Sequence, residues 1–439
     1  MLGVLLLLYV IAMMDRLILT MLVQPIQDDL GLTDFQISLI LGPAFAFSHA
    51  LAVFPLGWAS DRYRRTHILT FSVIFWSLAT TASAFARSFQ ALFVGRVGVA
   101  VGEAALLPAA YSLIADRFPR HRLTTGLAIF GMGPKIGTAA AFAVGALIFS
   151  FSERVGSIDV PFFGELGSWR LALFAIGAPG LLIALLALTF AEPLRRNLST
   201  APAQSGGCYT FMWSNRRIFG PLLIGFSLMG VCSGALNNWV PTYLTREFGW
   251  SPAQYGPVMS VISLAAASAI LLKGVAVDWL VGRGVSDAHV RFYTWLQAVS
   301  LPVLLIAFFL TSALGFLLLF GFVNIVVLTY LLYASAIIQI LAPNDKRGQV
   351  TAVFLFCSSV LAQGVGPSLV AAFTDFVFAD PTMLGTSLVI VSASALAGSL
   401  LALRISLRSM KAGLIAPPGP VPSAAQAPVA AGAEAWERK

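Results

Sequence analysis

A succession of apolar stretches, each long enough to cross a lipid bilayer, constrains this chain more than any other feature. A transmembrane helix needs about 20 mainly apolar residues. Twelve such helices are predicted, at residues 2–24, 35–58, 66–86, 89–115, 122–150, 169–190, 218–244, 252–280, 289–311, 314–341, 348–374 and 382–408. With 58% hydrophobic and only 10% charged side chains, 439 residues cannot form a water-facing surface. We therefore predict an all-α polytopic membrane protein with twelve transmembrane helices and the lipid bilayer as its surroundings.

The basic residues predict the orientation of these helices. Nearly all of them fall in connections on one side, whereas Arg87, Arg154, Arg170 and Arg246 lie on the other. Short cytoplasmic loops accumulate Lys and Arg, so we expect both termini in the cytoplasm and the chain in a bacterial cytoplasmic (inner) membrane. The net charge of +8 reflects this asymmetry. We therefore expect no nucleic-acid partner, and we expect a monomer.

The polar segments divide the chain. Residues 191–217 contain Pro, Ser and Gly and read as a cytoplasmic linker between two six-helix halves, 1–190 and 218–408. Residues 409–439 are rich in Pro and Ala, with little to bury, and are expected to form a disordered cytoplasmic tail.

No enzyme signature is present in the sequence. The cysteines Cys208, Cys232 and Cys357 are too scattered for a Cys-x-x-Cys site, so no metal site is expected. A phosphate-binding Gly-x-x-x-x-Gly-Lys-Ser/Thr loop is also missing. We therefore predict a carrier without a cofactor, with protons as the coupling ion.

Weak internal repetition supports two related halves. Gly57 and Asp61 close the second predicted helix, and Gly274 and Asp278 close the eighth, 217 residues later. Two further matches are Pro25 with Pro241, and Gly131-x-Gly133-Pro134 with Gly364-x-Gly366-Pro367. Transporters built from repeated halves show this kind of self-similarity.

The segment after the second helix resembles the signature of the major facilitator superfamily, Gly-x-x-x-Asp-Arg-x-Gly-Arg-Arg/Lys. It reads Gly57-Trp-Ala-Ser-Asp61-Arg62-Tyr63-Arg64-Arg65-Thr66 and departs from that pattern at positions 64 and 66. Asp61 can cap a helix and pair with arginines across the seam between the halves. We expect a cytoplasmic gate of Gly57, Asp61, Arg62, Arg65 and Asp116. A loop that only retains positive charge would explain the arginines, but not Gly57 or Asp61.

Within that superfamily the chain most resembles the spinster family of lipid transporters. The resemblance lies in Met14-Asp15-Arg16, in Arg96 followed by Gly102-Glu103-Ala104, in Leu113-Ile114-Ala115-Asp116, and in Trp239-Val240-Pro241-Thr242-Tyr243-Leu244. Gly133-Pro134-Lys135 departs from it and is closer to a glycine motif of antiporters. The resemblance implies alternating access and proton-coupled transport of a lysophospholipid or a sphingoid phosphate.

Charged groups inside the predicted spans are the strongest functional signal, because each costs at least about 2.5 kcal/mol at the bilayer centre. The first half carries six ionisable residues at such positions: Asp15, Arg16, His49, Arg96, Glu103 and Lys135. Asp15 and Arg96 lie at similar depth, so we expect them to form an ion pair, either structural or part of the coupling. Arg16 points about 100° away from Asp15 on the helix and needs another partner, for which a substrate anion is one option.

The other three residues are expected nearer the midplane. No cation is evidently committed to Glu103, which makes it the expected proton carrier. His49 is either a hydrogen-bonded core residue or part of the substrate cavity. Lys135 is either the partner of Glu103 or the counter-ion of an anionic headgroup, and the sequence leaves both open.

We expect the second half to be apolar apart from three asparagines in its predicted helices. Asn237, Asn238 and Asn324 supply uncharged donors and acceptors to the expected cavity. A cavity with charge on one wall and apolar side chains on the other suits an amphiphile better than a sugar. A carrier of small organic anions such as sugar acids is the alternative. A transport-inactive sensor is disfavoured, because kink and latch motifs in both halves have no use in a rigid body.

Overall fold

The computed structural model describes residues 1–155, 158–160, 164–193, 207–285, 287–342 and 347–411. The first half contains α1 (Leu2–Met21), α2 (Val23–Leu30), α3 (Asp34–Leu41), α4 (Pro43–Arg62), α5 (Arg65–Ser83), α6 (Phe89–Glu103), α7 (Leu106–Arg117), α8 (Arg120–Gly131), α9 (Gly133–Val155), α10 (Ser168–Ala184) and the 3-10 turn η1 (Leu185–Leu188). A short antiparallel hairpin, β1 (Ile158–Val160) with β2 (Gly164–Leu166), joins α9 to α10. The predicted all-α fold is confirmed, with this hairpin as an addition.

The second half begins with α11 (Gly207–Ser214), a short helix inside the segment expected to be a linker. It continues with α12 (Arg216–Phe248), α13 (Pro252–Gly282), α14 (Ala288–Ala307), α15 (Ala313–Val326), α16 (Tyr330–Leu341), α17 (Arg347–Val360), the π turn η2 (Leu361–Val365), α18 (Gly366–Ala372), the π turn η3 (Phe373–Phe378), the 3-10 turn η4 (Pro381–Met383) and α19 (Leu384–Lys411). Most of the expected tail lies outside the described residues.

Ten helical stretches in the described part of the chain are long and apolar enough to cross a membrane. The other two predicted spans correspond to α5 and to α15 with α16. α5 is less apolar because it buries polar side chains such as Thr70, Ser77 and Thr80 against its neighbours. The prediction of one continuous helix at 314–341 is wrong, since the chain leaves the helix between Val326 and Tyr330.

Several other spans are also broken where the sequence predicted continuous helices. The span predicted at 35–58 is interrupted at Gly42, and the span predicted at 122–150 at Met132. Pro43 directly follows the first break and begins α4, and a proline disfavours helical geometry in the residue before it. Gly42 also packs closely on the other half, because a Cβ there would lie 2.3 Å from the carbonyl oxygen of Gln363. Only glycine allows the two backbones to approach this closely.

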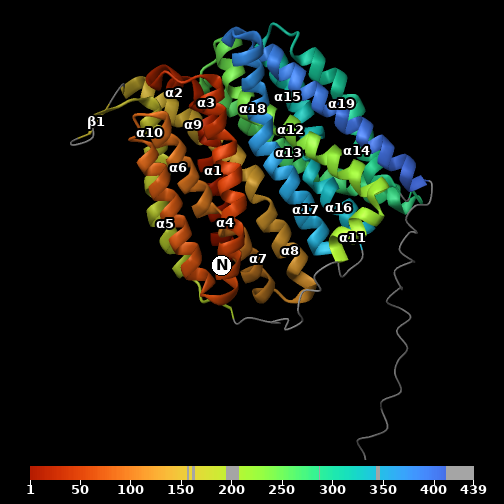
Figure 1. Ribbon diagram of the computed structural model, residues 1–439. Helices are drawn as coiled ribbons and strands as arrows, with labels where there is room; N and C mark the ends of the chain where they lie inside the picture. The colour runs from red at the N-terminus through yellow and green to blue at the C-terminus, as the bar shows by residue number, and fades with distance from the viewer. Residues whose placement is uncertain (156–157, 161–163, 194–206, 286, 343–346, 412–439) are drawn as a thin grey trace, which may run out of the picture.

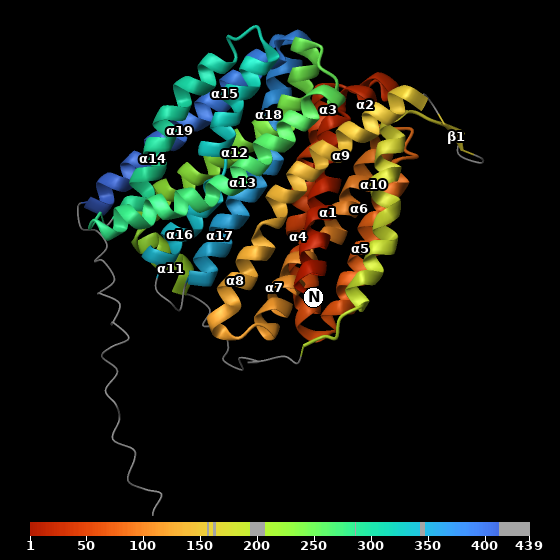
Figure 2. The ribbon, with the colours of Figure 1, turned by 180° about the vertical axis from the view of Figure 1, so that it is seen from behind.

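The two halves lean together at one end of the molecule and separate toward the other (Figures 1 and 2). α2, α3 and α18 meet at the converging end, which we call the Asp34 end. α7, α8, α16 and α17 reach the opposite end, where the chain begins, and which we call the Met1 end. The two-half arrangement predicted from the repeats is thus confirmed.

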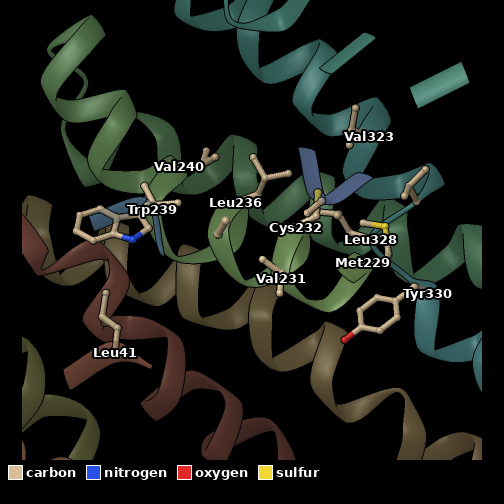
Figure 3. Packing of buried hydrophobic residues seen from close by; sticks show 14 of the residues in the cluster. Leu41, Met229, Val231, Cys232, Leu236, Trp239, Val240, Val323, Leu328 and Tyr330 are labelled. Carbon is tan, nitrogen blue, oxygen red and sulfur yellow. The ribbon is translucent and has the colours of Figure 1, made fainter. Parts of the chain in front are cut away.

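α12 forms the centre of the second half. Its Trp239 Nε1 donates a hydrogen bond of 2.9 Å to the carbonyl oxygen of Pro367. At Gly234 a Cβ would lie 1.6 Å from the carbonyl oxygen of Ala362, so α12 packs on η2 backbone to backbone. Figure 3 shows the surrounding buried side chains, among them Leu236. This packing fixes the wall that faces the first half.

Candidate functional site

The centre of the first half contains a buried ion pair between α1 and α6. Arg16 Nη2 lies 2.6 Å from Glu103 Oε2, and the Glu103 side chain is only 2% exposed. The second carboxylate oxygen, Oε1, is buried without a hydrogen-bond partner. The expectation that no cation is committed to Glu103 is therefore wrong, and Arg16 has the partner it needed.

Asp15 and Arg96 lie beside this pair but are not bonded to each other. Asp15 Oδ2 accepts a hydrogen bond of 2.5 Å from Thr80 Oγ1, and Arg96 Nη2 donates one of 3.1 Å to the backbone carbonyl of Arg16. The predicted Asp15–Arg96 ion pair is wrong. The short side chain of Asp15 faces α5, whereas the longer Arg16 side chain reaches across the difference in depth to Glu103.

Phe45 on α4 connects these charges to the seam between the halves. The guanidinium carbons of Arg16 and Arg96 lie 4.1 Å and 4.8 Å from the centre of its ring. The ring of His49, one turn further along α4, stacks on Phe45 at 5.4 Å. Cation–π contacts are strongest where water is excluded. A movement of either guanidinium would therefore change its attraction to the Phe45 ring.

A cavity of about 290 Å³ lies between α4 of the first half and α17 with η2 of the second. Its lining residues are Phe45, Ala46, His49, Ala50, Val53 and Phe54 on one wall, and Leu355, Phe356, Ser359, Val360 and Gln363 on the other. Most of these side chains are apolar, and His49, Ser359 and Gln363 are the polar members. Phe54 is 70% and Phe356 50% exposed, so the cavity borders the surface of the protein. The structure thus places His49 in a cavity that both halves form.

The asparagines of the second half are partly committed to their own helix. The Nδ2 groups of Asn237 and Asn238 donate hydrogen bonds of 2.8 Å to the carbonyls of Ser233 and Gly234. Asn324 Nδ2 reaches Asn237 Oδ1 at 3.5 Å, and its own Oδ1 is buried without a partner. Asn237 and Asn324 therefore lie together, and Asn324 retains a free acceptor.

Lys135 lies near the start of α9, and its ammonium group makes no hydrogen bond or ion pair with any residue that the structure describes. Glu103, one of its two expected partners, binds Arg16 instead. A second intramembrane lysine, Lys273 on α13, escaped the sequence analysis although it lies inside a predicted span. It is 8% exposed and donates to Thr329 Oγ1 at 2.5 Å and to the carbonyl of Ile325, at the break between α15 and α16.

At the Met1 end, Arg65 organises a network within the first half. Its Nη1 donates to Asp116 Oδ2 at 2.5 Å and to Ser112 Oγ at 2.8 Å, and its Nε donates to Glu192 Oε1 at 3.0 Å. Partial burial alone would raise the pKa of Glu192, but hydrogen bonds from the backbone and side chain of Arg65 hold that pKa below its ordinary value. The sequence analysis brought Arg65 and Asp116 together correctly and missed Glu192.

The other expected gate residues are less involved in this network. Arg62 is exposed, with its guanidinium 4.3 Å from the ring of Trp58. A Cβ at Gly57 would be 4.0 Å from Pro108, an ordinary contact, so packing does not require glycine there. The side chain of Asp61 lies outside the described residues, and its role in the gate stays a prediction.

The Asp34 end carries a charged contact between the halves that the sequence analysis also missed. Arg246 on α12 binds Asp34 on α3 through both guanidinium nitrogens, each at 2.7 Å. Close by, the backbone amide of Phe35 donates to Asp375 Oδ2 at 2.7 Å. We call the Arg246–Asp34 pair the outer latch, because it ties α12 of the second half to α3 of the first.

A sequence model of the Major Facilitator Superfamily matches residues 5–367. The chain belongs to this superfamily. Two solved structures of a bacterial homolog of the human lysosomal transporter Spinster share the fold. The inward-facing, occupied form has a TM-score of 0.76 and 25% identity, covering 96% of this chain and 98% of that one. The inward-facing, unoccupied form has a TM-score of 0.77 and 24% identity over 93% and 97%.

Sequence relatives are consistent with this membership. An MFS-type efflux pump of Mycolicibacterium smegmatis is 26% identical over 89% of this chain and 88% of the pump. Protein spinster homolog 1 of Xenopus laevis is 28% identical over 53% of this chain and 43% of that protein. A probable L-galactonate transporter of Escherichia coli is 24% identical over 64% and 62%. The spinster resemblance is confirmed at low identity, and the chain is an integral multi-pass transporter rather than an enzyme.

Proposed function

We propose that this transporter is a proton-coupled secondary carrier that moves an amphiphilic lysolipid, either a lysophospholipid or a sphingoid phosphate, by alternating access. The observation that carries the proposal is the buried Arg16–Glu103 pair, which touches the apolar cavity between the halves through Phe45. Buried ion pairs are rarely the most stable solution in a membrane and persist where they serve a function.

The proton binds at Oε1 of Glu103, the buried oxygen without a donor. A neutral Glu103 no longer holds Arg16 by charge, and the Arg16 guanidinium becomes free to move. Phe45 lies against that guanidinium and lines the cavity, so protonation reaches the seam between α4 and α17. Protonation of Glu103 would thus stabilise one arrangement of the two halves more than the other. Coupling requires such a difference between two conformations.

The conformation of the helices corresponds to one of the two states of an alternating-access cycle. The outer latch closes the Asp34 end, and the halves diverge at the Met1 end (Figure 1). The basic connections predict that the Met1 end is cytoplasmic. The described state is then inward-facing, in the cytoplasmic membrane of a bacterium.

The walls of the cavity favour a substrate with a hydrocarbon chain. Eight of its lining residues are apolar, and Phe54 and Phe356 are also exposed at the surface. Each buried methylene adds about 0.8 kcal/mol of affinity, which a hydrophilic substrate cannot use. The kinship with spinster proteins points the same way.

A carrier of sugar acids is the second candidate. It is favoured by relatives such as the D-galactonate transporter of Escherichia coli, 25% identical over 64% of this chain and 67% of that one. The free acceptor of Asn324 and the intramembrane cations could serve a hydroxylated anion.

Uptake into proteoliposomes under an imposed pH gradient tests both parts of the proposal. A series of lysophospholipids with one headgroup and increasing chain length should show rising affinity until the cavity limits it, whereas D-galactonate should not be transported. Glu103→Gln should abolish the dependence on the pH gradient while substrate binding remains measurable. Glu247→Gln, which removes an exposed carboxylate on α12, is the control and should leave coupling intact.

Undiminished proton-driven uptake by Glu103→Gln would remove Glu103 from the coupling step. Transport of D-galactonate, with no response to lysolipids of any length, would replace the lysolipid by a sugar acid.

A further inference from the structure

The second seam between the halves lies between α9 and α13. The two helices touch backbone to backbone toward the Asp34 end, since a Cβ at Gly256 would lie 2.6 Å from the carbonyl oxygen of Phe142. Lys135 precedes Phe142 by seven residues, or about two helical turns, and so lies on the same face of α9. Lys135 therefore faces α13, on the Met1 side of the glycine contact.

Lys273 approaches Lys135 from the other half. A helical side chain leans toward the N-terminus of its own helix, and α9 and α13 run in opposite directions (Figure 2). The side chain of Lys135 thus leans toward the Met1 end and that of Lys273 toward the Asp34 end. Lys273 follows Gly256 by 17 residues and Lys135 precedes Phe142 by seven, so Lys273 starts nearer the Met1 end and the two side chains lean toward each other along the seam.

Neither charge is neutralised by a carboxylate in the described part of the chain. Lys135 has no hydrogen-bond partner there, and Lys273 donates to neutral groups, the carbonyls of Ile325 and Val326 and the hydroxyl of Thr329. Arg16 differs, because Glu103 neutralises it. Two cations inside a membrane, one from each half and neither paired with a carboxylate of the described residues, are unfavourable unless an anion joins them.

We propose that Lys135 and Lys273 form the binding site for the anionic group of the substrate, a phosphate or a carboxylate, with one oxygen accepting from Lys135 and another accepting from Lys273 in place of its long, 3.4 Å bond to the carbonyl of Val326. The proposal rests on the transport function proposed above, and it moves the headgroup away from Arg16. Without the anion, repulsion between the lysines keeps this seam apart. With the anion bound, the two halves are drawn together, so that substrate binding itself favours closure of the Met1 end.

Affinity measurements on the purified full chain test this site. Lysophosphatidic acid and a monoacylglycerol of the same chain length differ only in the phosphate, and their affinity ratio isolates the headgroup. Lys135→Met should reduce that ratio at least about tenfold, as the loss of a charged hydrogen bond predicts, and Lys135→Arg should keep it within about threefold. Arg122→Gln, which removes an exposed charge from the neighbouring α8, should leave the ratio unchanged.

Lys273→Met should reduce the ratio in the same way. Because Lys273 also binds the end of α15, the melting temperature of the Lys273→Met protein is measured in parallel. If that variant unfolds, the Lys135 variants alone test the site. D-galactonate serves as an anion without a chain.

The possible results separate the site from the function. A ratio that stays unchanged in Lys135→Met overturns the lysine site, even where lysolipids still bind. If D-galactonate binds, loses affinity in Lys135→Met, and lysolipids fail, the site is supported and the lysolipid function is overturned.

Discussion

Breaking the outer latch should open the Asp34 end. Asp34→Asn leaves the side chain nearly unchanged in size and removes the charge that Arg246 binds. Arg246 makes two hydrogen bonds of 2.7 Å to Asp34, while Gln24 and Gln27 accept further bonds at 3.0 and 2.9 Å. The Asp34 side chain is 2% and the Arg246 side chain 18% exposed.

The size of the effect follows from this burial. Removing one partner of a fully buried ion pair costs about 3–5 kcal/mol. The guanidinium here is partly exposed and keeps its glutamine partners, so we expect a smaller loss of about 2 kcal/mol, confined to the conformation in which the latch is closed. That loss changes the ratio of closed to open states about 30-fold. A protein that is mainly closed at this end would then populate the open state substantially.

Spin labels at Asp28 and Glu247, both exposed at the Asp34 end on opposite halves, report this opening as a longer distance. Asp29→Asn is a matched control, because Asp29 binds Arg170 at 2.7 Å within the first half only. An unchanged distance distribution in Asp34→Asn would refute the latch. An equal shift in Asp29→Asn would show that any lost charge at this end has the same effect.

Two further predictions concern stability. Gly234→Ala should lower the melting temperature, because a Cβ there would lie 1.6 Å from the carbonyl oxygen of Ala362. Overpacking of this kind costs about 1–3 kcal/mol of stability. Gly220→Ala is the control and should leave the melting temperature unchanged, because a Cβ there meets nothing within 4 Å. Glu192→Gln should lower the melting temperature near neutral pH. Since the folded-state pKa of Glu192 is depressed, its contribution is present above its ordinary pKa and lost as pH falls through the folded value, so the difference between variant and wild type should shrink below about pH 4.

The transmembrane architecture could be predicted because the bilayer imposes a single requirement on each helix, an apolar length. Breaks within a span leave its hydrophobicity unchanged, so a hydropathy argument did not predict the gap between α15 and α16 or the break at Gly42, although Pro43 marks the latter in the sequence. The contact that demands Gly42 is with Gln363, which is more than 300 residues away in the sequence. Only the tertiary structure brings the two together.

The candidate site divides in the same way. Charges inside spans are rare enough to be found by inspection, and Arg16, Glu103 and Lys135 were found so, although Lys273 was overlooked. Their pairing depends on helix rotation and side-chain reach, which the sequence does not contain, and the wrong Asp15–Arg96 pair resulted. Arg246 gave no signal because a charge at a helix end is ordinary.

The two seams between the halves are built alike, which bears on what the carrier can accept. Gly42 meets the backbone of Gln363 in one seam, and Gly256 meets that of Phe142 in the other. The glycines are 214 residues apart, close to the offset of 217 between Gly57 and Gly274 in the sequence repeats. In each seam the glycine contact lies toward the Asp34 end. The two seams differ from each other on the Met1 side of that contact. There the first seam offers an apolar cavity and the second offers the lysines. A sugar acid has groups for the lysines and none for the cavity, whereas a lysolipid has a part for each seam and can act on both at once.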